Sequence, residues 1–71
     1  MKAILGISAF FHDSAATLII DGKIIAAAQE ERFTRKKHDA SYPFNAIEFV
    51  LKFGNLKLNQ VDQIIFFEKP F

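Results

Sequence analysis

An Asp21-Gly22 dipeptide between two apolar runs constrains the fold of this 71-residue chain more than any other feature. Aspartate followed by glycine accepts the positive φ angles of a two-residue type I′ turn, and that turn joins antiparallel strands. The sequence therefore predicts a hairpin with strands at residues 14–20 and 23–28. The second strand is rich in alanine over residues 26–28, and such small side chains indicate that another element packs closely on the sheet.

Two further strands and one helix complete the predicted order of elements. Residues 2–7 form an apolar run without alternation, typical of a strand buried on both faces. Apolar side chains then recur at helical spacing over residues 43–53, and residues 63–67 form the last apolar run. The helical stripe comprises Phe44, Ile47, Phe49, Val50, Leu51 and Phe53.

The helix has recognisable boundary residues at both ends. Ser41 or Tyr42 is the expected N-cap, and Pro43 suits the first turn, where its missing N–H is not needed. Gly54 is the expected C′ residue, because glycine adopts the left-handed conformation that ends many helices.

The order β-β-β-α-β, with a helical crossover after three antiparallel strands, places the chain in the α/β class. A right-handed crossover returns the last strand parallel to the first, which predicts a mixed sheet of strand order 3-2-1-4 with one main helix. This is the layout of a ribonuclease-H-like sheet. The last strand would be an apolar edge of the kind that proteins cover. We therefore expect a larger domain, or association of the chain through this edge, as in a homo-oligomer.

The connection between the first two strands is a candidate site. Residues 6–14, GISAFFHDS, are longer and more polar than a hairpin needs, which is typical of a functional loop. Within it, His12 has a side chain suited to a general base, and Asp13 is able to fix the imidazole tautomer. A lone histidine is as often a surface or packing residue, and spacing alone does not establish a dyad.

The small residues of the same connection allow two interpretations. Gly6, Ser8 and Ser14 offer backbone N–H groups and hydroxyls that suit an anion cradle. A turn that needs small side chains explains them equally well. Both interpretations remain open.

A second candidate site is the charged run at residues 29–39, QEERFTRKKHD, which follows the third strand. Glu31 and Arg35 are spaced for an ion pair on a helix, so a solvated helical turn explains the run. Alternatively, its basic stretch RKKH, which ends in Lys37 and His38, binds phosphate. Because the first and third strands run parallel in the predicted sheet, both candidate segments are expected to face one pocket.

Composition excludes several classes of protein. Nine Lys or Arg against eight Asp or Glu give a net charge of +1, which predicts no partner among nucleic acids or membranes. No apolar run approaches the ~20 residues that cross a bilayer, and the N-terminus lacks a signal-peptide pattern, so a cytoplasmic protein is expected. The chain has no cysteine, which excludes disulfides and thiolate metal sites.

Two motifs and their separation carry a resemblance to a known family. FHDSAA at residues 11–16 follows the first strand, and EERFTRKKHD at residues 30–39 follows the third. With the proline at position 43, this pattern resembles the start of the O-carbamoyltransferases, which include nodulation carbamoyltransferases and antibiotic-tailoring enzymes. The match is close over residues 3–43 and looser beyond them.

The resemblance implies a fold, a reaction and roles for two residues. Residues 1–71 would be the first part of an actin-like, Kae1-like N-terminal domain, without the rest of that domain or the YrdC-like domain. Enzymes of the family make carbamoyl-adenylate from carbamoyl phosphate and ATP, then transfer the carbamoyl group to a hydroxyl acceptor. His12 matches the histidine suited to deprotonating that hydroxyl. Lys37 matches the lysine suited to holding the anionic intermediate.

The resemblance also implies which groups this chain would share with the rest of an enzyme. Asp13, Ser14 and His38 are expected to bind substrate near His12. ATP and a divalent or iron metal belong to the full-length enzyme, whose metal ligands lie further along. We therefore expect this chain to bind no cofactor alone and to be inactive alone.

Two other classes of function remain open. One is the first lobe of an actin-like sugar kinase or ATPase, although Ser8 stands where those enzymes are expected to have an early aspartate. The other is a small non-catalytic module that associates with itself through the sheet edge.

Overall fold

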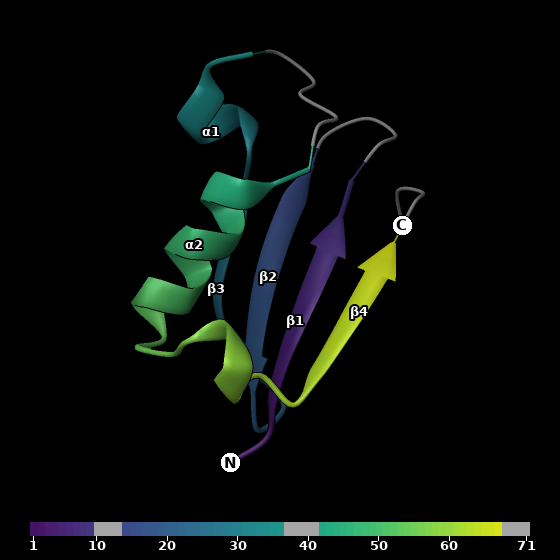
Figure 1. Cartoon of the computed structure of the whole chain (residues 1–71), viewed down its shortest axis with the longest axis vertical. Helices are drawn as coiled ribbons and strands as arrows, with labels where there is room; N and C mark the ends of the chain where they lie inside the picture. Colours follow the sequence, from purple (N-terminus) through teal and green to yellow (C-terminus); the bar gives the residue numbers. More distant parts are fainter. Residues whose placement is uncertain (10–13, 37–41, 68–71) are drawn as a thin grey trace.

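The computed structural model describes residues 1–9, 14–36 and 42–67. They form a single mixed sheet with helices packed on one face (Figure 1). The elements in chain order are β1 (Ala3–Ser8), β2 (Ala15–Ile20), β3 (Lys23–Gln29), α1 (Glu31–Thr34), α2 (Phe44–Phe53), η1 (Leu58–Gln60) and β4 (Gln63–Phe67). The strand order is β3-β2-β1-β4. The predicted α/β class, strand order and main helix are all confirmed.

The hairpin of β2 and β3 turns at the predicted dipeptide. Asp21 has a φ of 51° and Gly22 a φ of 81°, which are the positive angles that a type I′ turn requires. The two strands pair antiparallel, starting with Ile20 opposite Lys23. The register shifts once, between Leu18 and Ile19, so the strands are not regular along their whole length.

The strand β4 lies at the edge of the sheet and pairs with β1 in parallel, with Leu5 opposite Ile64 and Ile7 opposite Phe66. Asp62 holds the start of this pair. Its backbone N–H donates to the carbonyl of Ala3 at 2.8 Å, and its carboxylate accepts the N–H of Ala3 at 2.6 Å. The sequence gives no indication of this role for Asp62, because its partner Ala3 lies 59 positions away.

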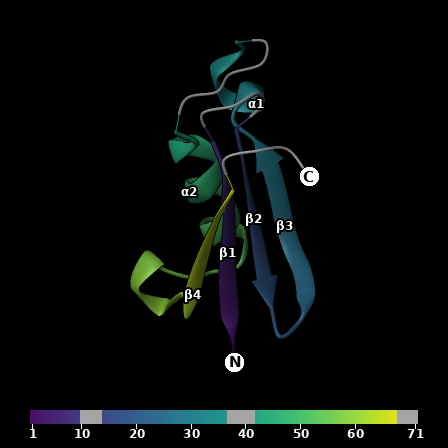
Figure 2. The ribbon, with the colours of Figure 1, turned by 90° about the vertical axis from the view of Figure 1, so that its right-hand side faces the viewer.

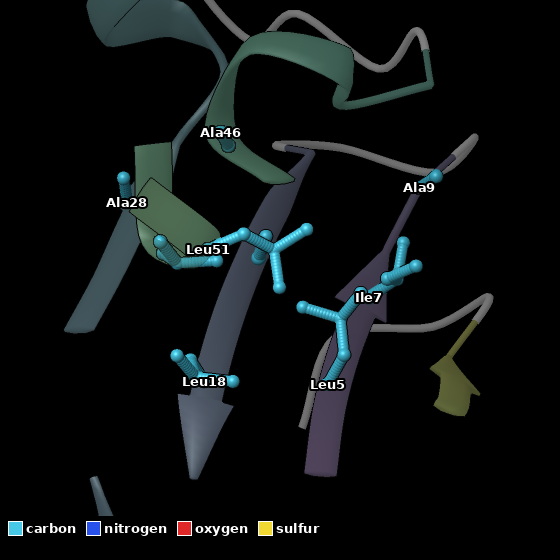
Figure 3. Packing of buried hydrophobic residues seen from close by; sticks show 9 residues of the cluster. Leu5, Ile7, Ala9, Leu18, Ala28, Ala46 and Leu51 are labelled. Carbon is cyan, nitrogen blue, oxygen red and sulfur yellow. The ribbon is translucent and has the colours of Figure 1, made fainter. Parts of the chain in front are cut away.

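The core lies between α2 and the three strands nearest to it (Figure 3). In Figure 2 the strands lie in front and α2 lies behind them, so the helix covers one face of the sheet. The hydrophobic cluster of the core comprises Leu5, Ile7, Ala9, Ala16, Leu18, Ala28, Ala46, Val50 and Leu51. Ala28 of β3 is buried beneath α2, as the alanine-rich strand predicted, whereas Ala27 is exposed.

The ends of α2 differ from the prediction in detail. Pro43 occupies the N-cap position and contributes no side-chain hydrogen bond, so the predicted cap at Tyr42 is wrong. Ser41, the alternative cap, lies outside the described residues. At the other end, Gly54 has a φ of −83°, and Asn55 adopts the left-handed conformation instead, with a φ of 56°.

The C-terminus of α2 forms a Schellman motif centred on Asn55. The N–H of Asn55 donates to the carbonyl of Lys52 at 3.0 Å, and that of Leu56 donates to the carbonyl of Leu51 at 2.9 Å. Gly54 is needed for a different reason than the one predicted. A Cβ atom at this position would overlap with Cδ2 of Leu18, so the helix end approaches β2 closely only with glycine there.

Candidate functional site

A backbone hydrogen bond joins the two candidate segments at one end of the sheet. Ser14, which follows residues 10–13, accepts a hydrogen bond at its carbonyl from the N–H of Glu30, at 2.8 Å. Glu30 follows β3 and precedes α1. The end of β1, the start of β2 and the start of α2 all lie at this end of the molecule (Figure 1).

Four of the predicted site residues lie outside the described residues, namely His12, Asp13, Lys37 and His38. Their roles therefore stay predictions. The expectation that both segments face one pocket is likewise untested. The structure shows only that Ser14, after residues 10–13, is hydrogen-bonded to Glu30, which precedes residues 37–41.

Three predicted residues are described, and they differ in position. Gly6 lies inside β1, opposite Thr17 of β2 and Ile65 of β4. Ser8 is the last residue of β1 and is partly buried, whereas Ser14 immediately precedes β2 and is fully buried. Ser8 and Ser14 therefore flank residues 10–13 on both sides. The anion cradle itself stays a prediction.

Gly6 has no steric reason to be glycine within the described residues. A Cβ there would be 3.9 Å from the carbonyl oxygen of Thr17 and 4.0 Å from its Cβ, which is ordinary contact. Glycine in the interior of a strand commonly marks a place where a ligand or another backbone approaches closely.

Glu30 has a role that its position in the charged run did not indicate. It was treated as one of several charged residues in the run 29–39, yet only 2% of its surface is exposed. Its carboxylate faces the first turn of α2. Oε1 accepts the N–H of Ala46 at 2.8 Å, and Oε2 accepts the side-chain amide of Asn45 at 2.7 Å and its backbone N–H at 3.3 Å.

This carboxylate takes the place of a missing N-cap. The first N–H groups of a helix have no partner within the helix, and Pro43 supplies no side chain to satisfy them. A negative charge is also favourable beside the positive end of the helix dipole. Because Ser41 offered a conventional cap, nothing in the sequence indicated that Glu30 would serve this helix start. Because Glu30 occupies these N–H groups, they are not free to bind a phosphate.

The charged run forms a helical turn, as one of the two interpretations predicted. It spans Glu31–Thr34 and ends at Arg35, which has a φ of 63° and donates its N–H to the carbonyl of Glu31 at 2.8 Å. The side chains of Arg32, Arg35 and Lys36 are exposed. The phosphate-binding interpretation depends on Lys37 and His38 and stays a prediction.

A shallow hollow of about 300 Å³ lies next to this turn, over the neighbouring ends of β2 and β3. It is lined by Ala15, Ala16, Thr17, Ala27, Ala28, Gln29 and Arg32. Over residues 1–9, 14–36 and 42–67, no three His, Asp or Glu side chains come together in a way that suits a metal ion. The same ranges contain no helix of the length and apolarity that a membrane crossing requires.

Comparison with known proteins gives one family and several relatives. The family described as Carbamoyltransferase N-terminus matches residues 3–71. An uncharacterized protein of Synechocystis is 60% identical over 70 residues, which is 99% of this chain and 11% of that protein. The nodulation protein NolNO of Sinorhizobium fredii is 40% identical over 58 residues, 82% of this chain and 8% of that protein.

A third relative is shorter. An uncharacterized 19.2 kDa protein of Rhizobium etli is 35% identical over 60 residues, 84% of this chain and 35% of that protein. The chain therefore spans between about a tenth and a third of the length of these relatives. The family match extends over nearly all of its residues, from β1 to beyond β4. This chain belongs to the carbamoyltransferase N-terminus family.

Proposed function

We propose that this chain is the first part of the N-terminal, Kae1-like domain of an O-carbamoyltransferase that acts in the cytoplasm. The observation that carries the proposal is the family match over residues 3–71. The strand order β3-β2-β1-β4, with the candidate segments at one end of the sheet, is consistent with an actin-like domain. The remainder of that domain and a YrdC-like domain would supply most of the active site, so the chain alone is inactive.

The proposed reaction has two steps. In the first step, water releases phosphate from carbamoyl phosphate, and an oxygen of the resulting carbamate attacks the α-phosphorus of ATP, so that carbamoyl-adenylate forms and pyrophosphate leaves. An acceptor hydroxyl then attacks the carbamoyl carbon, its proton passes to a base, and AMP leaves with the electron pair of the broken bond. His12 is the proposed base for this transfer, because imidazole has a pKa suited to accepting a proton near neutral pH.

The proposed contacts of the other residues follow from charge. Lys37 holds the anionic intermediate, and Asp13, Ser14 and His38 bind substrate near His12. Gly6 and Ser8 border the proposed anion cradle. ATP and the metal are bound by parts of the full-length protein beyond this chain. The described residues have no set of side chains that fits a metal, so no step is assigned to one here.

The test uses a chimera in which residues 1–71 replace the matching segment of a full-length family enzyme with measured carbamoyl transfer. Formation of carbamoyl-adenylate and carbamoylation of the acceptor are assayed separately. His12→Asn should leave the first step largely intact and slow the second by the ~10²–10⁴-fold typical of a lost general base. Lys37→Ala should weaken both steps, because the anionic intermediate is formed in one and consumed in the other.

The outcomes separate the alternatives. Equal losses in both steps for His12→Asn would show that His12 shapes the pocket and does not move the proton. No loss in either step would return it to a surface residue. A chimera with no transfer at all, although it folds, would contradict the proposed function itself.

A further inference from the structure

The strand β4 has an edge that a further strand can join. It is the last strand of the order β3-β2-β1-β4 and lies at the outer side of the sheet (Figure 1). Its five residues, Gln63–Phe67, pair with β1 without a register shift. None of the five is charged, and none is proline. Natural edge strands commonly carry a charge, a proline or a bulge that prevents further pairing, and β4 has none of these devices.

The opposite edge of the sheet, β3, is protected. Its pairing with β2 shifts in register between Leu18 and Ile19, and such an irregularity bends and twists a strand. The strand also begins with the exposed Lys23, and a charge on an edge opposes pairing. The two edges of one copy are therefore unlike. Within a second copy of this chain, the strand best suited to join β4 is the other β4.

Two β4 strands can pair antiparallel around a two-fold axis perpendicular to the sheet. Such an axis keeps the face covered by α2 on the same side in both copies. With the axis at Ile65, all five residues of each strand take part, and Ile64 of one copy stands opposite Phe66 of the other. Ile64 and Phe66 are the partners of Leu5 and Ile7 in β1, which are buried on the α2 side, so they share that face.

An opening beside β4 gives this pairing something to cover. An apolar hollow of about 210 Å³ lies between β4 and α2. Its walls include Phe44 of α2, Leu58 of η1 and Ile64 of β4, which are 71%, 54% and 53% exposed. In the two-fold pair, Phe66 of each copy stands next to Ile64 of the other, beside that copy's hollow. Pairing therefore removes apolar surface from water in both copies at once.

We propose that β4 is a self-pairing surface, through which two copies of this chain join around a two-fold axis at Ile65. Phe66 of each copy covers the hollow of the other, and the two four-stranded sheets become one continuous sheet. Because both copies use the same surface, the pair closes as a dimer and does not grow into a filament. This inference concerns the 71-residue chain and does not depend on the proposed function.

Disulfide trapping tests the position of the axis. The chain has no cysteine, so an introduced thiol reacts only with its equivalent in another copy. On the axis, residue 65 faces itself at about 4.5–5.5 Å between Cα atoms, which a disulfide spans. With oxidised glutathione, Ile65→Cys should form a covalent dimer about 10-fold faster or more than Ile24→Cys. Ile24 on β3 is the matched control, because it is 71% exposed against 36% for Ile65, so random collision would favour it.

Two further variants test the register. Residue 64 stands opposite residue 66 of the other copy, whereas two copies of residue 64 are about 7–8 Å apart, beyond the reach of a disulfide. Ile64→Cys alone and Phe66→Cys alone should therefore cross-link slowly. An equimolar mixture of the two should form the mixed dimer about 10-fold faster or more.

Phe66→Ala tests the role of the hollow. Sedimentation velocity over a concentration series gives the Kd of the dimer. Each dimer of this variant lacks two rings, so Kd should rise by about 10-fold or more. Phe53→Ala is the matched control and should leave Kd unchanged, because Phe53 is 65% exposed on α2 and does not line the hollow. If circular dichroism shows that Phe66→Ala does not fold, Phe66→Leu replaces it, with a smaller rise in Kd.

Four results would overturn the inference. A wild-type chain that stays monomeric at high concentration has no self-pairing surface. Cross-linking of Ile24→Cys as fast as that of Ile65→Cys would indicate collision without pairing. A disulfide between these two variants in a mixture, or mass that keeps growing beyond the dimer, would show head-to-tail contact of β4 with β3. Faster cross-linking of Ile64→Cys alone than in the mixture would place the axis at another residue.

Discussion

At the scale of the residue, three residues with positive φ angles shape the hairpin turn and the end of α2. Asp21, Gly22 and Asn55 have φ angles of 51°, 81° and 56°. Aspartate, glycine and asparagine are the residues that accept such angles with the least strain. The hairpin and the end of α2 therefore depend on residues whose contribution is conformational and not a matter of packing.

Gly22→Val tests the hairpin turn. Nothing lies within 4 Å of a Cβ at Gly22, so the substitution would add no clash, and its cost would come from a β-branched residue at positive φ. We expect the free energy of unfolding to fall by roughly 1–3 kcal/mol in urea denaturation. Lys23→Val, at the exposed first residue of β3, is the control and should be tolerated. An unchanged midpoint for Gly22→Val would place the turn elsewhere.

At the scale of the element, α2 is defined by neighbours at both of its ends. Glu30 satisfies the first N–H groups, and the close approach of Leu18 requires glycine at position 54. Of the predicted apolar stripe, Val50 and Leu51 pack into the core together with Ala46, which the stripe did not include. The predicted stripe was wrong for its phenylalanines, since Phe44, Phe49 and Phe53 are exposed. Tertiary contacts thus define both ends of the helix and decide which of its apolar side chains are buried.

Gly54→Ala tests the packing of the helix end. The added methyl would overlap with the Leu18 side chain, which is fully buried and has little room to move. We expect a loss of roughly 1–3 kcal/mol in the free energy of unfolding, as for other overpacked sites. Asn55→Gly is the matched control at the next position, where glycine suits a φ of 56°. A stable Gly54→Ala chain would mean that the helix end moves away from β2 at little cost.

At the scale of the whole molecule, the sheet is covered unevenly. The helix α2 packs against the β2 and β3 side of the sheet, and the β4 edge carries Ile64 at 53% exposure and Phe66 at 43%. An apolar hollow of about 210 Å³ lies between this edge and α2. It is lined by Leu5, Ile7, Tyr42, Phe44, Ile47, Leu58 and Ile64. An uncharged edge strand beside an apolar hollow favours association.

We therefore expect the 71-residue chain to associate in solution through β4. Ile65→Lys places a charge in the middle of that strand, and charges on edge strands oppose pairing with another strand. Sedimentation velocity should show an associated wild type and a largely monomeric Ile65→Lys variant. Ile24→Lys is the control, because Ile24 is 71% exposed on β3, at the opposite edge. A wild-type chain that stays monomeric at high concentration would contradict the expectation.

The order of the elements was predictable because it depends on interactions between residues close in sequence. The Asp21-Gly22 turn, the helical stripe of α2 and the apolar run of β4 are local patterns, and right-handed crossover then leaves few possible topologies. The strand order β3-β2-β1-β4 followed from these patterns without knowledge of any distant contact. For the candidate site, the motifs identified the two segments, and the structure brings Ser14 of the first and Glu30 of the second together at one end of the sheet.

The details of the helix ends and of the site anchors were decided by tertiary structure alone. Glu30 looked like one more surface charge, because its partners Asn45 and Ala46 are 15 and 16 positions away. Asp62 bonds to Ala3 across 59 positions, and the close approach of Leu18 fixes the role of Gly54. A carboxylate has the same chemistry on the surface and in the interior, and only the folded chain determines which donors surround it. The sequence by itself thus determined the layout of the sheet and helix, whereas tertiary contacts decided which polar residues hold that layout together.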